Sequence, residues 1–162
     1  QIVSKVSFEK IWTKIPLSLK KMTLSQSILE ISDFTLEKND PYPRLFKILV
    51  ETFKHFETSS LDENICFWHY ETKLLSEMGF LIDMEDKNIN EEGLVSLEKT
   101  DNSFQVLSKL IEGNVFDIDF DNISTIDKKN ISNFLYQKLC YYFDGFERLK
   151  SFRVIKDIFY KG

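Results

Sequence analysis

The sequence predicts a mainly helical protein with a single domain, and three observations support this. Apolar residues recur at intervals of three and four through most of the chain, as on the buried face of an α-helix. Gly and Pro, which interrupt helices, number five and three, against fifteen Phe. The length, 162 residues with 43% hydrophobic side chains, is enough to bury one sizeable core. We therefore expect one domain of about six helices.

The N-terminal part of the chain predicts a connector followed by a first helix. Residues 1–16 have mixed periodicity and end at Pro16, which is typical of a short strand or helix leading into a domain. We interpret them as a connector from a missing N-terminal domain, and residues 17–162 as the helical domain. One apolar stripe then predicts a helix that ends before residues 38–41. Its members are Leu19, Met22, Ile28, Ile31 and Phe34.

The next two helices are predicted on either side of a short polar interval. A turn at residues 39–43 precedes the second helix, which runs from about Arg44 to Phe56. The third helix runs from about Leu61 to Met78 and has so broad an apolar arc that several neighbours must cover it. We therefore expect the third helix to be central. The core side of the second helix comprises Leu45, Ile48, Leu49, Thr52, Phe53 and Phe56.

The second half of the chain predicts a small extended insertion and three more helices. Gly79 fits the position after a helix end, and the apolar runs that follow it predict a β-hairpin-like insertion within residues 79–98. The helices are expected at about residues 103–112, 127–142 and 149–160. The core positions predicted to be buried are Leu49, Phe53, Tyr70, Leu74, Leu75 and Phe134.

Charge is distributed unevenly along the chain. The formal net charge of −5 gives no overall basic character of the kind expected for an autonomous nucleic-acid binder. Residues 1–21 nevertheless carry five Lys and one Glu, and residues 145–162 carry five basic and two acidic groups. Residues 62–101 carry eleven acidic groups and three Lys. If the fold brings the two ends together, one face attracts phosphate and another repels it; the alternative is an ordinary mixed surface.

The sequence contains no motif for catalysis or for metal binding. GxxxxGK, GxGxxG and GxSxG are absent, and the two His and two Cys lack zinc-ligand spacing, so no cofactor, no metal and no enzyme activity are expected. Residues 117–122 imitate the start of a calcium loop, but Asn122 and Lys128 stand where that loop needs Gly and Glu. A solvated acidic loop is the expected interpretation. Cys66 and Cys140 fit buried, reduced thiols of a cytoplasmic protein.

Three segments, read in order, resemble the RecO family of bacterial recombination mediators. Leu24–Phe53 is similar to the family's two helices joined by an acidic or proline-containing turn. Phe67–Phe80 is similar to its helix ending in Gly-aromatic, and residues 92–96 are similar to the strand that follows. Tyr141–Phe159 is similar to its terminal helix. The three segments span nearly the whole chain in the family's order.

The resemblance implies the C-terminal helical domain of a DNA-repair mediator, with the family's N-terminal oligonucleotide/oligosaccharide-binding (OB) barrel absent. Some family members bind zinc through four Cys after the Gly-aromatic turn, whereas residues 82–98 contain none. Family members bind single- and double-stranded DNA, anneal strands coated by single-stranded-DNA-binding protein (SSB), and cooperate with RecR in loading RecA. The alternatives are a helical protein-interaction domain with no nucleic-acid role, and an enzyme of unrecognised type.

The first candidate site is a set of basic residues near the two ends of the chain. We expect weak, salt-sensitive DNA binding from them, because each neutralised phosphate releases counterions. The alternative is that they are solubilising surface charges. The set comprises Lys20, Lys21, Arg148, Lys150 and Arg153.

The second candidate site is a groove for the acidic tail of SSB, which the resemblance implies as a partner. The tail ends in an apolar residue with a free carboxylate, so its receptor needs an apolar pocket edged by cations. Trp68 and His69 stand where the family usually places an Arg, and a neutral His holds a carboxylate poorly. Either a lysine of the preceding helix binds the carboxylate in place of the Arg, or the affinity for the tail is reduced. The alternative is plain core packing against the third helix. The second predicted helix supplies Arg44, Leu45, Lys47, Leu49, Phe53 and Lys54.

Overall fold

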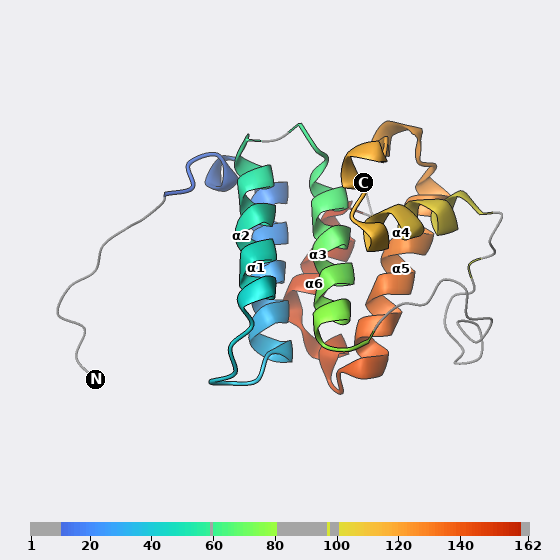
Figure 1. Cartoon of the computed structure of the whole chain (residues 1–162). Coiled ribbons are helices and arrows are strands. Elements are labelled where there is room, and N and C mark those ends of the chain that lie inside the picture. The colour runs from blue at the N-terminus through green and yellow to red at the C-terminus, as the bar shows by residue number, and fades with distance from the viewer. Residues whose placement is uncertain (1–10, 59, 81–96, 98–100, 160–162) are drawn as a thin grey trace.

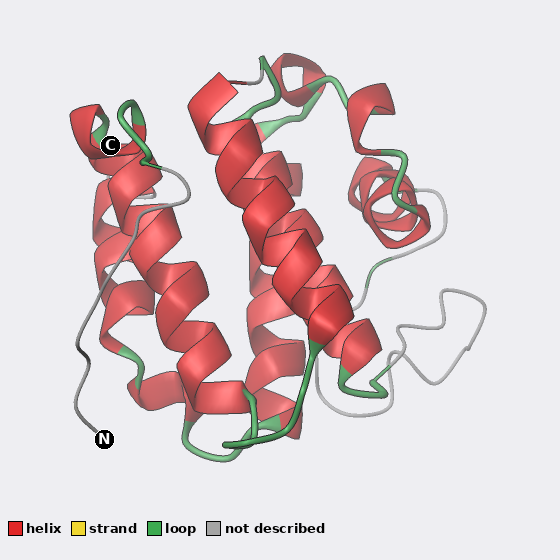
Figure 2. Ribbon diagram, turned by 60° about the vertical axis from the view of Figure 1, so that its left-hand side comes forward, coloured by secondary structure: helices red, strands yellow, loops and turns green. Residues whose placement is uncertain are grey.

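The computed structural model describes residues 11–58, 60–80, 97 and 101–159, with side chains of the last helix described as far as Ile155. This part of the chain contains helices and loops but no strand (Figures 1 and 2). The α-helices are α1 (Leu19–Thr35), α2 (Pro43–Thr58), α3 (Glu63–Glu77), α4 (Asn102–Glu112), α5 (Thr125–Tyr142) and α6 (Lys150–Phe159). Short 3-10 turns are η1 (Ile15–Leu17), η3 (Val115–Asp117), η4 (Phe120–Asn122) and η5 (Phe146–Arg148).

The prediction of a mainly helical protein with six helices is confirmed for the described residues. The structure lends no support to the hairpin predicted within residues 79–98, because nearly all of that segment lies outside the described residues. Gly79 itself has a φ of 85°, the left-handed conformation expected after a helix end, and Phe80 N donates to Leu75 O at 2.8 Å. The position of that helix end is therefore confirmed.

The helices pack around α3, which contacts α1, α2, α4 and α5. Figure 1 shows α2 and α3 in front of α1 and α6, and α1 packs directly on α6. The central position predicted for this helix is confirmed, since Tyr70, Leu74 and Leu75 are fully buried, as is Phe134 of α5. Leu49 and Phe53, also predicted as core, are only partly buried.

The buried face of α1 differs from the predicted stripe. Ile28 and Ile31 are buried, but Leu19 is 62% exposed. Small hydroxyl residues occupy much of the buried face instead: Thr23, Ser25, Ser27, Ser32 and Thr35. Several of these hydroxyls donate to a carbonyl four residues earlier, which satisfies them inside their own helix. Met22 and Phe34 of the predicted stripe are exposed as well.

The segment before α1 is attached to the end of α2 by one carboxylate. Glu57 accepts hydrogen bonds from the backbone N–H groups of Thr13, Lys14 and Ile15 at 2.9 to 3.2 Å, and from the Thr13 hydroxyl at 2.8 Å. Burial by itself raises the pKa of Glu57, but these hydrogen bonds outweigh it and lower the pKa to about 2. The predicted connector thus ends in a docked 3-10 turn, while residues 1–10 lie outside the description.

Candidate functional site

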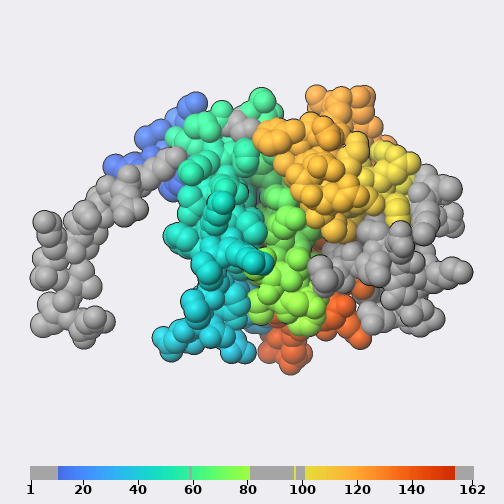
Figure 3. Space-filling view, viewed as in Figure 1, coloured from blue at the N-terminus to red at the C-terminus, as the bar shows by residue number. Residues whose placement is uncertain are grey.

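The cationic residues predicted to edge the tail groove lie on the open side of α2. Arg44, Lys47 and Lys54 are all exposed, and α2 lies at the front of the molecule in the space-filling view (Figure 3). Lys47 Nζ lies 4.0 Å from Glu51 Oε1, but both side chains are more than half exposed. An exposed pair of this kind contributes little to stability, so Lys47 is available to a partner.

The apolar residues of the predicted groove face in two directions. Leu45 is buried, and together with Leu49 it lines a hollow of about 460 Å³ between α1 and α2. The lining of this hollow carries Asp33, Glu37 and Asp40 against Lys38, so its net negative charge opposes a terminal carboxylate. Phe53 instead packs edge-on against Trp12, with ring centroids 6.1 Å apart, and supports the N-terminal segment.

Trp68 and His69 face different helices. Trp68 is buried and its Nε1 donates to Ser132 Oγ of α5 at 3.1 Å. His69 Nδ1 lies 3.2 Å from the carbonyl oxygen of Leu110 at the end of α4. Burial lowers the pKa of His69, although the hydrogen bond to Leu110 opposes this, so the ring is neutral near pH 7. The two residues therefore do not form one clamp with the α2 track.

His69 shares a hollow with one face of α2. A cavity of about 180 Å³ lies between α2, α3 and η3, and its lining includes Ile48, Glu51, His55 and His69. His55 is the residue that sequence reasoning missed. His55 lies four residues after Glu51 and seven after Ile48, so all three residues lie on one face of the helix. This spacing could have identified His55 from the sequence. Cys66 also lines this cavity, but burial raises the pKa of its thiol to about 12, so it stays protonated.

Lys20 and Lys21 are occupied by acidic and carbonyl groups of the protein itself. Lys20 Nζ lies 3.3 Å from Glu63 Oε2, and Lys21 Nζ donates to the carbonyl of Phe56, in the last turn of α2, at 2.6 Å. Lys21 also lies 3.8 Å from Glu63. Both lysines thus stabilise the junction of α1, α2 and α3, and a phosphate would have to compete with Glu63 for them.

The other predicted DNA-binding residues gather where α6 begins. Arg148, Lys150 and Arg153 are all exposed. Glu30 of α1 accepts hydrogen bonds from the backbone N–H groups of Lys150 and Ser151 at 3.2 and 2.9 Å, which fixes the start of α6 beside the second half of α1. Lys20 and Lys21 lie at the opposite end of α1. The structure therefore divides the five predicted residues into two separate groups.

Residues 16–95 match the family model described as Recombination protein O C terminal. The chain contains a RecO C-terminal helical domain. The matched range includes α1, α2 and α3, and hence the whole predicted tail groove. No curated protein and no solved structure matches the chain. A RecO domain indicates a role in recombination and DNA repair. None of the helices described is long and apolar enough to span a membrane.

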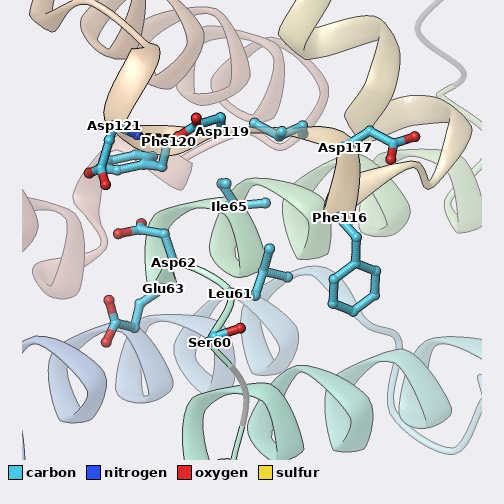
Figure 4. Close-up of a pocket in the computed structure, with 11 residues that line it drawn as sticks. Ser60, Leu61, Asp62, Glu63, Ile65, Phe116, Asp117, Asp119, Phe120 and Asp121 are labelled. Atoms are coloured by element: carbon cyan, nitrogen blue, oxygen red, sulfur yellow. Dashed lines mark hydrogen bonds between the residues drawn. The ribbon is translucent and has the colours of Figure 1, made fainter.

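The acidic loop at residues 117–121, outside the matched range, forms one side of an open groove. Figure 4 shows Asp117, Asp119 and Asp121 on one side and Asp62 and Glu63 on the other, around a volume of about 600 Å³. The carboxylate of Asp119 is used within the loop, since it accepts from the backbone N–H of Asp121 at 3.1 Å. Among the residues described, no cluster of His, Cys, Asp and Glu is arranged to hold a metal ion.

Proposed function

We propose that this chain is a non-catalytic adaptor of RecO-type recombination and repair, acting in the cytoplasm. It would bind the acidic tail of SSB, cooperate with RecR and assist DNA contacts during strand annealing and RecA loading. The observation that carries the proposal is the match of residues 16–95 to the RecO C-terminal family. An adaptor needs accessible cations and hollows rather than reactive groups, and the open face of α2 and the start of α6 supply them.

Within this proposal, DNA contacts rest on the basic group at the start of α6. Arg148, Lys150 and Arg153 are exposed, and the acidic neighbour of Arg148, Glu147 at 3.6 Å, is exposed as well. Lys20 and Lys21 contribute less because Glu63 already neutralises much of their charge. The expected binding is weak and falls with salt, since it depends on counterion release.

Reversing two of these charges should abolish retention of DNA. In the variant Lys150→Glu with Arg153→Glu, we expect a labelled single-stranded oligonucleotide to show no anisotropy increase at low salt. For single strands the slope of log K against log salt changes by roughly 0.7 for each phosphate that the protein no longer neutralises. The matched control is Lys38→Glu with Lys129→Glu, two exposed lysines elsewhere whose reversal changes the net charge equally. Equal loss in the control, or unchanged retention in the first variant, would make the basic group ordinary surface charge.

The SSB tail is proposed to bind along the open face of α2, beside the cavity shared with His69. Arg44 and Lys47 supply the cations, and the lining of that cavity, with Ile48, supplies apolar surface. His69 is neutral and its Nδ1 contacts the carbonyl oxygen of Leu110. The terminal carboxylate of the tail would therefore bind to the two α2 cations. This placement keeps the predicted helix but moves the apolar contact from Leu45 and Leu49 to the other side of α2.

Removing the α2 cations should weaken binding of the tail without unfolding the protein. A fluorescent acidic peptide ending in Phe is titrated into wild type and into Arg44→Ala with Lys47→Ala. Loss of one charge-assisted hydrogen bond costs about 1.5 kcal/mol, so Kd should rise roughly tenfold or more. Lys129→Ala with Lys150→Ala, at two exposed positions on α5 and α6, is the control, and Tm should be unchanged in both variants. Absence of wild-type binding at high micromolar peptide would remove the tail function from this protein.

The second candidate function is a helical protein-interaction domain with no role at nucleic acid. The acidic groove in Figure 4 favours it, because Asp117, Asp119 and Asp121 repel phosphate along one side of the molecule. The two functions separate in the experiments above. Tail binding without any salt-sensitive DNA retention supports the interaction domain, whereas both activities together support the RecO-type mediator.

A further inference from the structure

The side chain of Glu71 is almost fully buried and lines a cavity inside the helical bundle. The residue is 2% exposed, and no hydrogen bond or ion pair joins it to any residue in the described part of the chain. Burying an unpaired carboxyl group costs free energy, and natural cores pair nearly all such groups. The contacts of Glu71 within the described fold therefore do not explain why a carboxyl group is buried at this position.

The Glu71 side chain lines a small cavity between α1, α3, α5 and α6. The cavity has a volume of about 40 Å³, which is room for roughly two or three water-sized groups. Asn64 and Asn133 also line it, and Asn133 is exposed, so one side of the cavity lies close to the surface between α3 and α5. A small polar group from solution would enter from this side of the cavity.

Aromatic rings form much of the remaining wall. Phe67, Trp68, Tyr136 and Phe152 all line the cavity. The ring centroids of Tyr136 and Phe152 are 5.2 Å apart, and those of Phe67 and Phe152 are 6.2 Å apart, so the rings form a continuous surface. Aromatic faces carry negative electrostatic potential and attract cations, most strongly where water is excluded. A carboxyl group among such rings is suited to a cation and unsuited to an anion.

Only Glu71 can change its charge within this wall near neutral pH. Burial raises the pKa of Tyr136 to about 12, which keeps the phenol neutral. Asp62 and Glu63, at the start of the same helix, lie beside Lys20 and do not line the cavity. Burial also raises the pKa of Glu71 well above its ordinary value, which favours the protonated carboxylic acid.

We propose that the Glu71 cavity is a binding site for a primary ammonium group, either a small alkylammonium ion or the end of a lysine side chain. The volume admits an ammonium group with one or two carbon atoms, and excludes a quaternary ammonium. On binding, the O–H bond of the Glu71 carboxyl group breaks and its proton leaves to solvent. The resulting carboxylate pairs with the ammonium, so one cation enters for each proton released. This site is independent of the proposed DNA and tail contacts.

The proposal predicts a specific spectroscopic response and a linked proton. Methylammonium chloride is titrated into the full chain labelled with ¹⁵N, with sodium chloride as the ionic-strength control. Trp68 lines the cavity and Trp12 does not, so the indole N–H signal of Trp68 should shift and that of Trp12 should stay. Binding should strengthen up to tenfold per pH unit while Glu71 remains protonated, because one proton competes with one cation.

Variants at Glu71 and Glu77, and related ammonium compounds, test the proposal. Glu71→Gln keeps the shape but cannot form the ion pair, so the shift and the pH dependence should both disappear, while Glu77→Gln, at an exposed position on α3, should behave as wild type. Tetramethylammonium should give no response. A response to Nα-acetyl-lysine methylamide in addition to methylammonium assigns a lysine side chain, and a response to methylammonium alone assigns a small ion. An unchanged response in Glu71→Gln, a pH-independent response, or no wild-type response overturns the proposal.

Discussion

Replacing Glu57 by Gln should release the N-terminal segment from the helical bundle. The carboxylate accepts hydrogen bonds from three consecutive backbone N–H groups, of Thr13, Lys14 and Ile15, and a neutral amide cannot accept all of them with the same strength. Amide hydrogen exchange at residues 13–15 should therefore accelerate strongly in Glu57→Gln. The fluorescence of Trp12, which packs on Phe53, should shift to the red as its ring becomes exposed to water.

The same hydrogen bonds give Glu57 a definite pH dependence. Its pKa of about 2 is below the ordinary value of 4.5, so the folded state holds the carboxylate more strongly than the unfolded state does. This stabilisation is fully present above pH 4.5 and is lost as the pH falls towards 2. In Glu57→Gln that part of the acid dependence should vanish. Glu51→Gln is the matched control, because Glu51 lies on the same helix but is exposed. Equal exchange in both variants would show that Glu57 does not hold the segment.

The helix positions could be predicted from sequence because they depend on local signals. The Gly79 turn and the long apolar arc of α3 each depend on residues that are close together in the sequence. The buried face of α1 could not be predicted in the same way. An apolar pattern marks Leu19, Met22 and Phe34 but passes over the hydroxyl residues that are buried there. Ser and Thr fit a close helix contact when their hydroxyls bond within their own helix, a condition that hydropathy does not register.

The contacts of the candidate site residues with other helices could not be predicted from the sequence. Charge counting finds Lys20 and Lys21, but it cannot find their partner Glu63, which lies on another helix. Successive helical residues also point in directions about 100° apart, so Trp68 and His69 face α5 and α4 respectively. Residues close in the sequence are therefore separated, while His55 and His69 meet at one cavity. Such pairings depend on how the helices pack.

Replacing Glu71 by Gln should stabilise the protein at neutral pH, in buffers free of amines. Burial raises the pKa of Glu71 above its ordinary value of 4.5, so the folded state keeps a proton that the unfolded state loses. Stability therefore declines as the pH rises above 4.5, by up to about 1.4 kcal/mol per pH unit, until the folded-state pKa is reached. Gln has the same shape and stays uncharged, so the variant should lack this decline.

The measurement is urea unfolding of wild type, Glu71→Gln and Glu77→Gln at a series of pH values between 4 and 8. The difference between wild type and Glu71→Gln should be smallest near pH 4, because Glu71 is then protonated in both the folded and the unfolded state. It should widen with pH and then level off, and the level reached measures the pKa of the buried carboxyl group. Glu77→Gln should follow wild type, since Glu77 is exposed on the same helix. A constant difference at all pH values would show that Glu71 does not change its protonation on unfolding, and a wild type that gains stability with pH relative to Glu71→Gln would show that the buried group is a paired carboxylate.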